Sequence, residues 1–200
     1  MSDNPLWKNI SHKVFSGKKA ESFRFTGSGG HGLITASVIL AKAGVIDGYN
    51  VLQSQVYGAE ARGGSTKSET IIRKGEIYYP KLVTPDFLIA LTNEGLQRYR
   101  VDVVKTGIII IDSTLIPEEK PSDAGPYVVA LPMWVELLKE LKTGFAINIV
   151  SLGVVVGMTE VVKKSSLEEV VHDSFRPEFK ESNQKALDLG YKLAEEARRG

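Results

Sequence analysis

The segment FRFTGSGGHGLITAS (residues 23–37) decides the fold of this 200-residue chain. Four glycines follow an alternating apolar run and precede an apolar run with helical spacing, and together Gly27, Gly29, Gly30 and Gly32 fit the pattern G-x-G-x-x-G. A strand that enters a helix through such a turn is typical of dinucleotide-binding α/β domains. The turn also offers backbone N–H groups and the positive end of a helix dipole to an anion. The segment therefore predicts an α/β domain with a turn that suits a phosphate.

A dinucleotide site requires one further residue, which the chain lacks. An Asp or Glu at the end of the second strand, about 20 residues after the turn, binds a ribose hydroxyl in such sites. Here the second strand is expected to end near Gln53, and no nearby arginine suggests a site for a 2′-phosphate. NAD and NADP are therefore disfavoured. Two interpretations stay open: the turn contacts an anion, to which His31 could donate, or its glycines only permit close packing of helix on strand.

Composition indicates an ordinary globular protein. The chain is 42% hydrophobic and 24% charged, and a formal charge of +1 favours neither nucleic acid nor a membrane surface as a partner. No apolar run approaches the ~20 residues that span a bilayer, and no signal peptide is visible, so we expect a cytoplasmic protein. Because the chain has no cysteine, it cannot ligate an iron–sulfur cluster through thiolates. Its three histidines are far apart in sequence, so no metal site is expected.

The pattern along the chain predicts a polar extension over residues 1–20 and one α/β domain over residues 21–200. Strands are expected from residue 23 and at 50–53, 86–91, 107–112 and 126–131, and helices at 33–44, 92–105, from 132, at 148–158, from 165 and from 177. Strands that alternate with helices predict a single three-layer domain with a mostly parallel, Rossmann-like sheet.

Two local motifs add detail to this domain. Residues 70–73 and 76–79 flank Lys74-Gly75, which predicts one β-hairpin insertion with a two-residue turn. Ser165 with Glu168, and Ser166 with Glu169, each match a capping box and predict the start of a helix.

The polar segment QVYGAEARGGSTKSE (residues 55–69) is a second candidate for function. A loop of this length within a compact domain is usually functional. Arg62, followed by Gly63 and Gly64, can turn its guanidinium toward a carboxylate or a phosphate. Glu60 can pair with Arg62 instead, so a solvated turn with a surface ion pair remains an alternative.

Two polar residues within apolar segments have open roles. Asn148 in an expected buried helix is either a satisfied core amide or an interface contact. Asp112 at the end of an expected strand either faces a ligand or caps the next turn. We find no nucleophile elbow, P-loop or catalytic triad, and so no catalytic residue.

Five segments, in order, resemble the gamma subunit of 2-oxoacid:ferredoxin (acceptor) oxidoreductases over about residues 23–190. They are the glycine turn, YGAEARGG (57–64), YYPKLVTPDFLIAL (78–91), GIIIIDST (107–114) and NIVSLGVVVG (148–157). The YG-x-E-x-RGG loop is the most specific of these, and its sequence is closest to the 2-oxoglutarate branch. The candidate ligand-binding or interface residues are Gly27, Gly29, Gly30, His31, Gly32, Tyr57, Glu60, Arg62, Gly63, Gly64 and Asn148.

The resemblance implies a subunit of an enzyme that oxidatively decarboxylates a 2-oxoacid, here expected to be 2-oxoglutarate, to an acyl-CoA. It implies alpha and beta partner subunits, a delta subunit as a further candidate, and ferredoxin or a similar electron acceptor. Thiamine diphosphate, Mg²⁺ and iron–sulfur clusters would lie on those partners, with no cofactor on this chain. The chain would support assembly and contribute to coenzyme A binding, and would be inactive alone. The alternatives are a stand-alone Rossmann-like NAD(P)- or nucleotide-binding enzyme and a protein-binding scaffold module.

Overall fold

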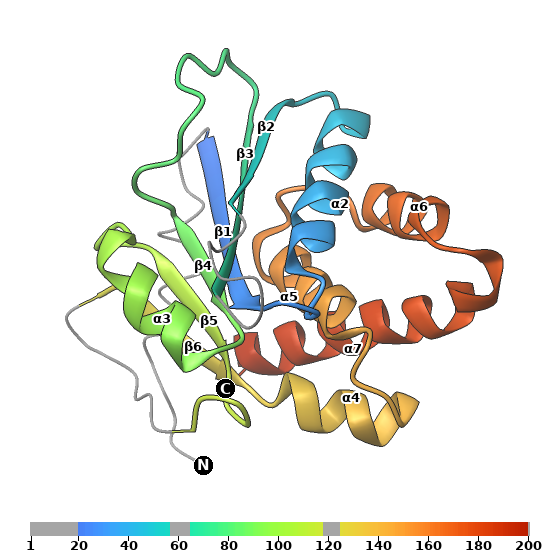
Figure 1. Ribbon diagram of the computed structural model, residues 1–200. Coiled ribbons are helices and arrows are strands. Elements are labelled where there is room, and N and C mark those ends of the chain that lie inside the picture. Colours follow the sequence, from blue (N-terminus) through green and yellow to red (C-terminus); the bar gives the residue numbers. More distant parts are fainter. Residues whose placement is uncertain (1–19, 57–64, 118–124, 200) are drawn as a thin grey trace.

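The order of strands and helices follows the pattern expected from the sequence. The computed structural model describes residues 20–56, 65–117 and 125–199 (Figure 1). The strands are β1 (Ala20–Ser28), β2 (Asn50–Val56), β3 (Ser65–Arg73), β4 (Phe87–Ala90), β5 (Ile108–Asp112) and β6 (Tyr127–Leu131). The helices are α2 (Leu33–Ile46), α3 (Asn93–Tyr99), α4 (Met133–Leu141), α5 (Ile147–Thr159), α6 (Lys164–Ser174) and α7 (Lys180–Arg199), with 3₁₀ turns η1 (Arg100–Asp102) and η2 (Pro177–Phe179).

Six strands form one sheet in the order β2-β3-β1-β4-β5-β6. β1, β4, β5 and β6 are parallel, whereas β3 runs antiparallel to both of its neighbours, β1 and β2. β4 and β5 are buried along their whole length, as expected for parallel strands that are covered on both faces. The predicted mostly parallel sheet is confirmed.

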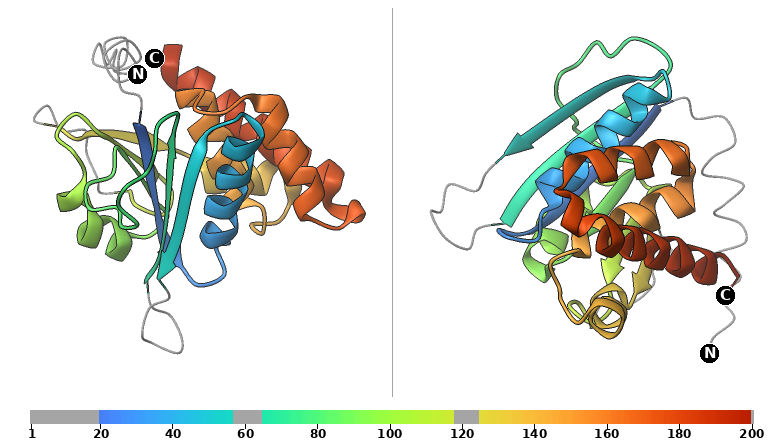
Figure 2. Two further views of the ribbon diagram at one scale, coloured as in Figure 1. Left: turned by 90° about the horizontal axis from the view of Figure 1, so that it is seen from above. Right: turned by 90° about the vertical axis from the view of Figure 1, so that its right-hand side faces the viewer.

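Helices cover both faces of this sheet and complete three layers. α3 lies on one face, and α2, α4, α5, α6 and α7 lie on the other, as the view from above in Figure 2 shows. Every residue of α5 is buried, and α7 packs directly against it. A Cβ atom at Gly153 of α5 would lie only 2.6 Å from the backbone oxygen of Leu187 on α7, so the two helices touch through their backbones. The fold class is confirmed.

The boundary of the N-terminal extension stays a prediction, because residues 1–19 lie outside the described residues. No helix in the described ranges is long and apolar enough to cross a membrane.

The hairpin predicted at Lys74-Gly75 is wrong, because residues 74–86 contain no strand. β3 pairs instead with β2, from Asn50 opposite Arg73 to Val56 opposite Lys67. The predicted loop over residues 55–69 is correspondingly shorter, since its two ends belong to β2 and β3.

The polar composition of β3 hid this strand from sequence analysis. Its buried positions use hydroxyl groups that bond to one another across layers: the hydroxyls of Ser37 on α2 and Thr70 on β3 lie 2.8 Å apart. Gln53 on β2 donates through Nε2 to the Ser68 hydroxyl at 3.2 Å. Short polar side chains that satisfy each other can be buried without penalty, so a polar run here forms strand rather than loop.

The two predicted capping boxes do not form. α6 begins at Lys164, and its N-cap residue makes no side-chain cap bond. Asp47, which follows α2, accepts a hydrogen bond from the backbone N–H of Lys163 and another from the Ser166 hydroxyl, both at 2.6 Å. The Asp47 side chain is only 5% exposed. A carboxylate from another helix end therefore stabilises the start of α6.

α3 has the predicted cap but is shorter than predicted. Thr92 Oγ1 accepts a hydrogen bond from the Gly95 N–H at 3.3 Å. The helix ends at Tyr99 rather than near Lys105, and η1 follows it. This tighter turn brings Asp102 to the buried guanidinium of Arg24.

Candidate functional site at the carboxyl edge of the sheet

The glycine turn joins β1 to α2 over residues 29–32. Gly30 and Gly32 have φ of +96° and +69°, a backbone region that favours glycine. The His31 N–H donates to the Ser28 carbonyl at 3.2 Å and closes the turn. Gly32 is the N-cap of α2, and no side chain caps the helix there. The first N–H groups of a helix have no intrahelical acceptor, so this end of α2 can donate to an anion.

Asn148, in the first helical turn of α5, contacts the glycine turn. Its Nδ2 donates to the Gly32 carbonyl at 3.4 Å, and its side chain is buried. A Cβ atom at position 32 would lie 2.8 Å from that nitrogen. Two sequence candidates 116 residues apart are thus in contact. The core-amide interpretation of Asn148 is supported by this bond, and its role at an interface remains a prediction.

His31 is half-buried within the turn. Its Nδ1 is buried and has no hydrogen-bond partner among the described residues. Burial lowers the pKa of His31 from its usual value of 6.5. The ring is therefore neutral at pH 7. A Cβ atom at Gly27 would lie 2.9 Å from Nδ1, which is a packing reason for glycine at that position.

The register of β1 with β3 places both ends of the second candidate segment at this edge. Ser28 is opposite Ser65, and the Thr66 hydroxyl donates to the Gly27 carbonyl at 2.9 Å. β2 runs in the same direction as β1, so Val56 also ends at the carboxyl edge. Segment 57–64 therefore leaves and re-enters the described chain beside the glycine turn. Its candidates, Tyr57, Glu60, Arg62, Gly63 and Gly64, lie outside the described residues.

Asp112 has a structural role at the same edge. Its Oδ1 accepts from the N–H groups of Thr114 and Leu115 at 2.7 and 3.0 Å, and its Oδ2 accepts from Trp134 N–H at 2.6 Å. The residue is fully buried. Of the two interpretations left open by the sequence, the cap is correct.

The dinucleotide interpretation finds no support in β2. This strand continues to Val56, three residues beyond the expected end, and Ser54, Gln55 and Val56 add no acid. Gln53 itself donates to Ser68. No carboxylate of β2 is therefore available for a ribose hydroxyl.

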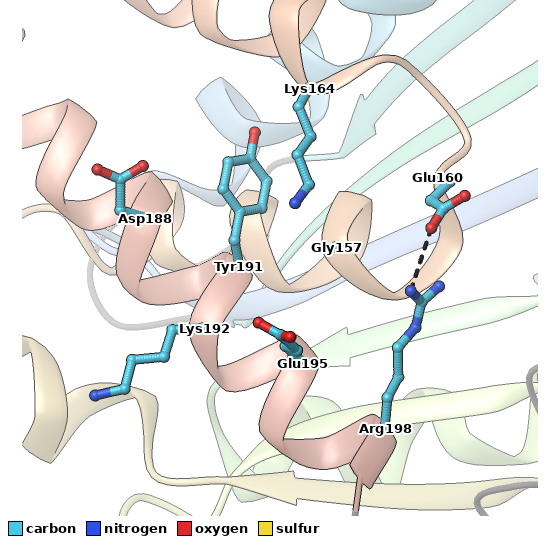
Figure 3. A pocket seen from close by; sticks show the side chains of 8 residues that line it. All are labelled: Gly157, Glu160, Lys164, Asp188, Tyr191, Lys192, Glu195 and Arg198. Carbon is cyan, nitrogen blue, oxygen red and sulfur yellow. Dashed lines mark hydrogen bonds and ion pairs between the residues drawn. The ribbon is translucent and has the colours of Figure 1, made fainter.

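A cleft of about 480 Å³ lies between α5, α6 and α7 and was not foreseen from the sequence (Figure 3). Its lining residues are Gly157, Glu160, Lys164, Asp188, Tyr191, Lys192, Glu195 and Arg198. Arg198 is engaged with Glu160 at 3.2 Å and with the Met158 carbonyl at 2.9 Å. The Lys164 ammonium lies 4.4 Å from the centre of the Tyr191 ring. Burial raises the pKa of the Tyr191 phenol. The lining residues on α7 look in sequence like the solvated face of an amphipathic helix, so nothing in the sequence indicated a cleft there.

The donor groups of the described residues do not form a site for the metal clusters that the resemblance implies. The sequence contains no cysteine. Within residues 20–56, 65–117 and 125–199, no group of three His, Cys, Asp or Glu side chains could hold a metal ion. A cysteine-ligated iron–sulfur cluster therefore has no ligand set on this chain.

Comparison with known proteins identifies the family. Residues 22–193 match the model described as pyruvate ferredoxin/flavodoxin oxidoreductase. The chain belongs to this family. The 2-oxoglutarate synthase subunit KorC of Methanocaldococcus jannaschii is 34% identical over 180 residues, covering 90% of this chain and 96% of the relative. The gamma subunit of a keto/oxoacid ferredoxin oxidoreductase from Geobacter sulfurreducens superposes with a TM-score of 0.77 at 36% identity, covering 88% of this chain and 99% of that one. The sequence-based recognition of a gamma-type oxidoreductase subunit is confirmed.

Other relatives carry the same domain within a longer chain. The 2-oxoglutarate:ferredoxin oxidoreductase of Magnetococcus marinus, solved with 2-oxoglutarate, coenzyme A and succinyl-CoA bound, superposes with a TM-score of 0.78 at 25% identity over 90% of this chain but only 32% of its own. The ketoisovalerate oxidoreductase subunit VorA of Methanothermobacter thermautotrophicus is 30% identical, and the match covers 34% of that subunit. In these proteins the gamma-type domain is covalently joined to further protein.

Substitutions in the glycine turn of this gamma-type subunit should separate backbone strain from side-chain contact. Gly30→Ala places a Cβ atom on a residue with positive φ but meets no neighbouring atom, and it is expected to lower the free energy of unfolding by about 1–2 kcal/mol. Gly32→Ala adds the contact with Asn148 and is expected to lose about 1 kcal/mol more. Gly29→Ala meets no atom within 4 Å and serves as the matched control, with a change within ~0.5 kcal/mol. Urea unfolding measures all three, and equal losses for Gly30→Ala and Gly32→Ala would contradict the close contact.

His31 should make the gamma-type subunit less stable in mild acid. Below pH 6.5 an unfolded histidine takes up a proton, whereas folded His31, with its lowered pKa, does not. The unfolded state then binds more protons, so the free energy of unfolding falls as the pH decreases from 6.5 toward the folded pKa. In His31→Gln the urea midpoint should fall less than in wild type between about pH 7.5 and 5.5. His172→Gln on α6 is the control for the loss of a histidine elsewhere in the chain. If the urea midpoints of wild type and His31→Gln fall equally with pH, His31 is not the cause of the loss of stability.

Proposed function

We propose that this chain is the gamma subunit of a 2-oxoglutarate:ferredoxin oxidoreductase. The whole enzyme would convert 2-oxoglutarate and coenzyme A to succinyl-CoA and carbon dioxide and pass the electrons to ferredoxin in the cytoplasm. The observation that carries this proposal is the match to KorC subunits of 2-oxoglutarate synthase along nearly the full length of both chains. A match of this extent supports the same role in an enzyme of the same kind.

The chemistry belongs to partner subunits in this proposal. A chain without cysteine supplies no thiolate for a cluster, and its described residues contain no cluster of three metal-ligating side chains. Alpha and beta subunits, with a delta subunit as a further candidate, would therefore hold thiamine diphosphate, Mg²⁺ and the iron–sulfur clusters. The gamma subunit would bind, orient and assemble rather than react.

The carboxyl edge is the part of this chain that we assign to that task. There the start of α2 has no side-chain cap, so its N–H groups suit a phosphate of coenzyme A or a partner carboxylate. Val56 and Ser65 enter segment 57–64 at the same edge. Arg62 and the other candidates of that segment would form one contact surface with the glycine turn, which Asn148 supports through its bond to Gly32.

Purification of the assembled enzyme tests the function. A tag after Gly200 should copurify iron-containing partner chains from the native host. The complex should reduce a viologen dye only when 2-oxoglutarate and coenzyme A are both present, whereas the chain alone should be colourless and inactive. Activity with pyruvate or 2-oxoisovalerate in place of 2-oxoglutarate would show that the branch is wrong. Absence of any cluster-bearing partner would show that the function is wrong.

Arg62 is the sharpest test of the proposed contact surface. A charge-assisted contact of a guanidinium to a phosphate or carboxylate contributes roughly 1.5–3 kcal/mol, so Arg62→Ala should weaken the contact about ten- to hundredfold. A contact to coenzyme A would appear in its apparent affinity and disappear at saturating coenzyme. A contact to a partner would appear as subunit dissociation on dilution at any coenzyme concentration.

Two variants make the Arg62 result specific. Arg62→Lys keeps the charge but loses the planar fork, so an intermediate effect would point to bidentate binding. Arg176→Ala removes an arginine whose side chain is 83% exposed and should behave as wild type. Wild-type assembly together with wild-type coenzyme dependence in Arg62→Ala would leave segment 57–64 as a solvated turn.

A further inference from the structure

A group of large apolar side chains is exposed on the α3 side of the sheet. Tyr78, Tyr79 and Val83 lie on the connection between β3 and β4, and Val101 lies on η1; they are between 67% and 80% exposed. They are four of the ten large apolar residues that the described chain exposes. We call these four residues the tyrosine–valine patch. In Figure 1 the β3–β4 connection and α3 lie on the same side of the sheet, away from α7.

The buried guanidinium of Arg24 fixes the two segments that carry the patch. Its Nη2 donates to the carbonyls of Leu82 and Val83 at 3.2 and 3.4 Å, and its Nη1 bonds to the carboxylate of Asp102, next to Val101. Its Nε donates to Glu69 at 2.7 Å. Because one side chain that is 2% exposed binds both segments, the backbone at Val83 and the η1 turn that carries Val101 lie beside each other.

Backbone contacts to β1 hold the same connection in place. The Asp86 N–H donates to the Ser22 carbonyl at 3.0 Å, and the Ser22 hydroxyl donates to Asp86 Oδ2 at 2.8 Å. The Val104 N–H donates to the Pro85 carbonyl at 3.1 Å. A segment without helix or strand is thus tied to the sheet and to η1. The part of the connection next to Val83 is therefore preformed, which favours binding because little ordering is required there.

The charges around the patch indicate what it binds. Within residues 74–86 and 98–105 the exposed charged residues are Lys74, Glu76, Lys81, Arg98 and Lys105, four cations and one anion. The two other acids of these stretches are engaged: Asp86 bonds to Ser22, and Asp102, whose side chain is 41% exposed, is neutralised by Arg24. An apolar centre with a basic rim is complementary to an apolar surface ringed by carboxylates.

We propose that the tyrosine–valine patch is the docking surface for another subunit of the same enzyme, which presents apolar side chains ringed by Asp and Glu. This inference rests on the proposed function. A second copy of the chain would set the basic rim against itself. Residues 1–19 carry four lysines and one acid, so they meet the same repulsion. The longer relatives, in which this domain is about a third of the chain, agree with a domain that adjoins further protein.

Substitutions in the patch should weaken assembly without unfolding the subunit. Tyr79→Ser and Val101→Ser change exposed side chains, so the melting temperature of the isolated chain should stay that of wild type. In the tagged complex, each should raise the dissociation constant for the partner at least about tenfold, measured by mass photometry on dilution. Val45→Ser, at an apolar side chain that is 63% exposed on α2, is the matched control and should assemble as wild type.

Charge reversal tests the predicted acidic rim of the partner. Lys81→Glu should weaken the complex and make its affinity less dependent on salt, because an attraction becomes a repulsion. Lys42→Glu, on the exposed side of α2, is the control. A Lys81→Glu complex with wild-type affinity would overturn the charge argument and, with it, the choice of partner.

The possible failures are distinguishable. If tagged wild type copurifies no cluster-bearing partner, the proposed function fails. If wild type yields an active complex and Tyr79→Ser and Val101→Ser assemble equally well, the patch proposal fails while the function stands. If the isolated chain dimerises and these substitutions abolish the dimer, the occupant is a second copy. If deletion of residues 1–19 increases chemical labelling of Tyr78 and Tyr79, the occupant is the chain's own N-terminal segment. Either of the last two results overturns the proposal.

Discussion

The antiparallel register of β1 with β3 is the constraint on which the rest of the molecule depends. A shift of one residue would exchange the two faces of β3, moving Thr70 away from Ser37 and Glu69 away from Arg24. The register is set by a polar pair on each face rather than by apolar side chains alone. Separating the buried ion pair of Arg24 and Glu69 would cost a charge-assisted hydrogen bond between two side chains that are nearly excluded from water. The same register brings Ser65 opposite Ser28, so the candidate contact surface at the carboxyl edge is a direct consequence of strand pairing.

The two edges of the sheet have different chemistry because of this arrangement. At the carboxyl edge, backbone groups dominate: a turn with two positive φ angles, an uncapped helix start and a buried aspartate that binds three N–H groups. On the α3 side, toward the amino ends of the strands, side chains dominate, with an apolar centre and a basic rim held by Arg24. In the proposed function, the subunit would contribute to the enzyme by presenting these two surfaces to its partners.

Much of the fold was predictable because its central strands and helices have unambiguous patterns. The run of isoleucines in β5 and the apolar segment of α5 could only be buried, and the glycines at 27–32 could only be a turn. The failures have a common physical cause, since each involves polar groups that are satisfied by residues distant in sequence. β3 resembled a loop because its hydroxyls find partners on α2, and the start of α6 resembled a capping box because Asp47 was not expected there.

The candidate site was predictable in part. The glycine turn and Asn148 were recognised separately, and their contact across 116 residues follows only from the packing of α2 on α5. The cap by Asp112 was one of two roles that the sequence left open, and its bonds to Thr114 and Leu115 are local. The cleft around Tyr191 and the patch around Tyr79 depend on tertiary neighbours, which local patterns do not encode. Segment 57–64 is a candidate for function because of its sequence alone, and the structure adds only the positions of the strand ends on either side of it.

α2 links two of these features mechanically. Its 14 residues form a rod of ~21 Å, whose first residue follows the glycine turn and whose far end is followed by Asp47, the cap of α6. Ser37, near its start, joins it to the sheet through Thr70. One continuous helix therefore connects the glycine turn at one end of the sheet to the start of α6 at the other.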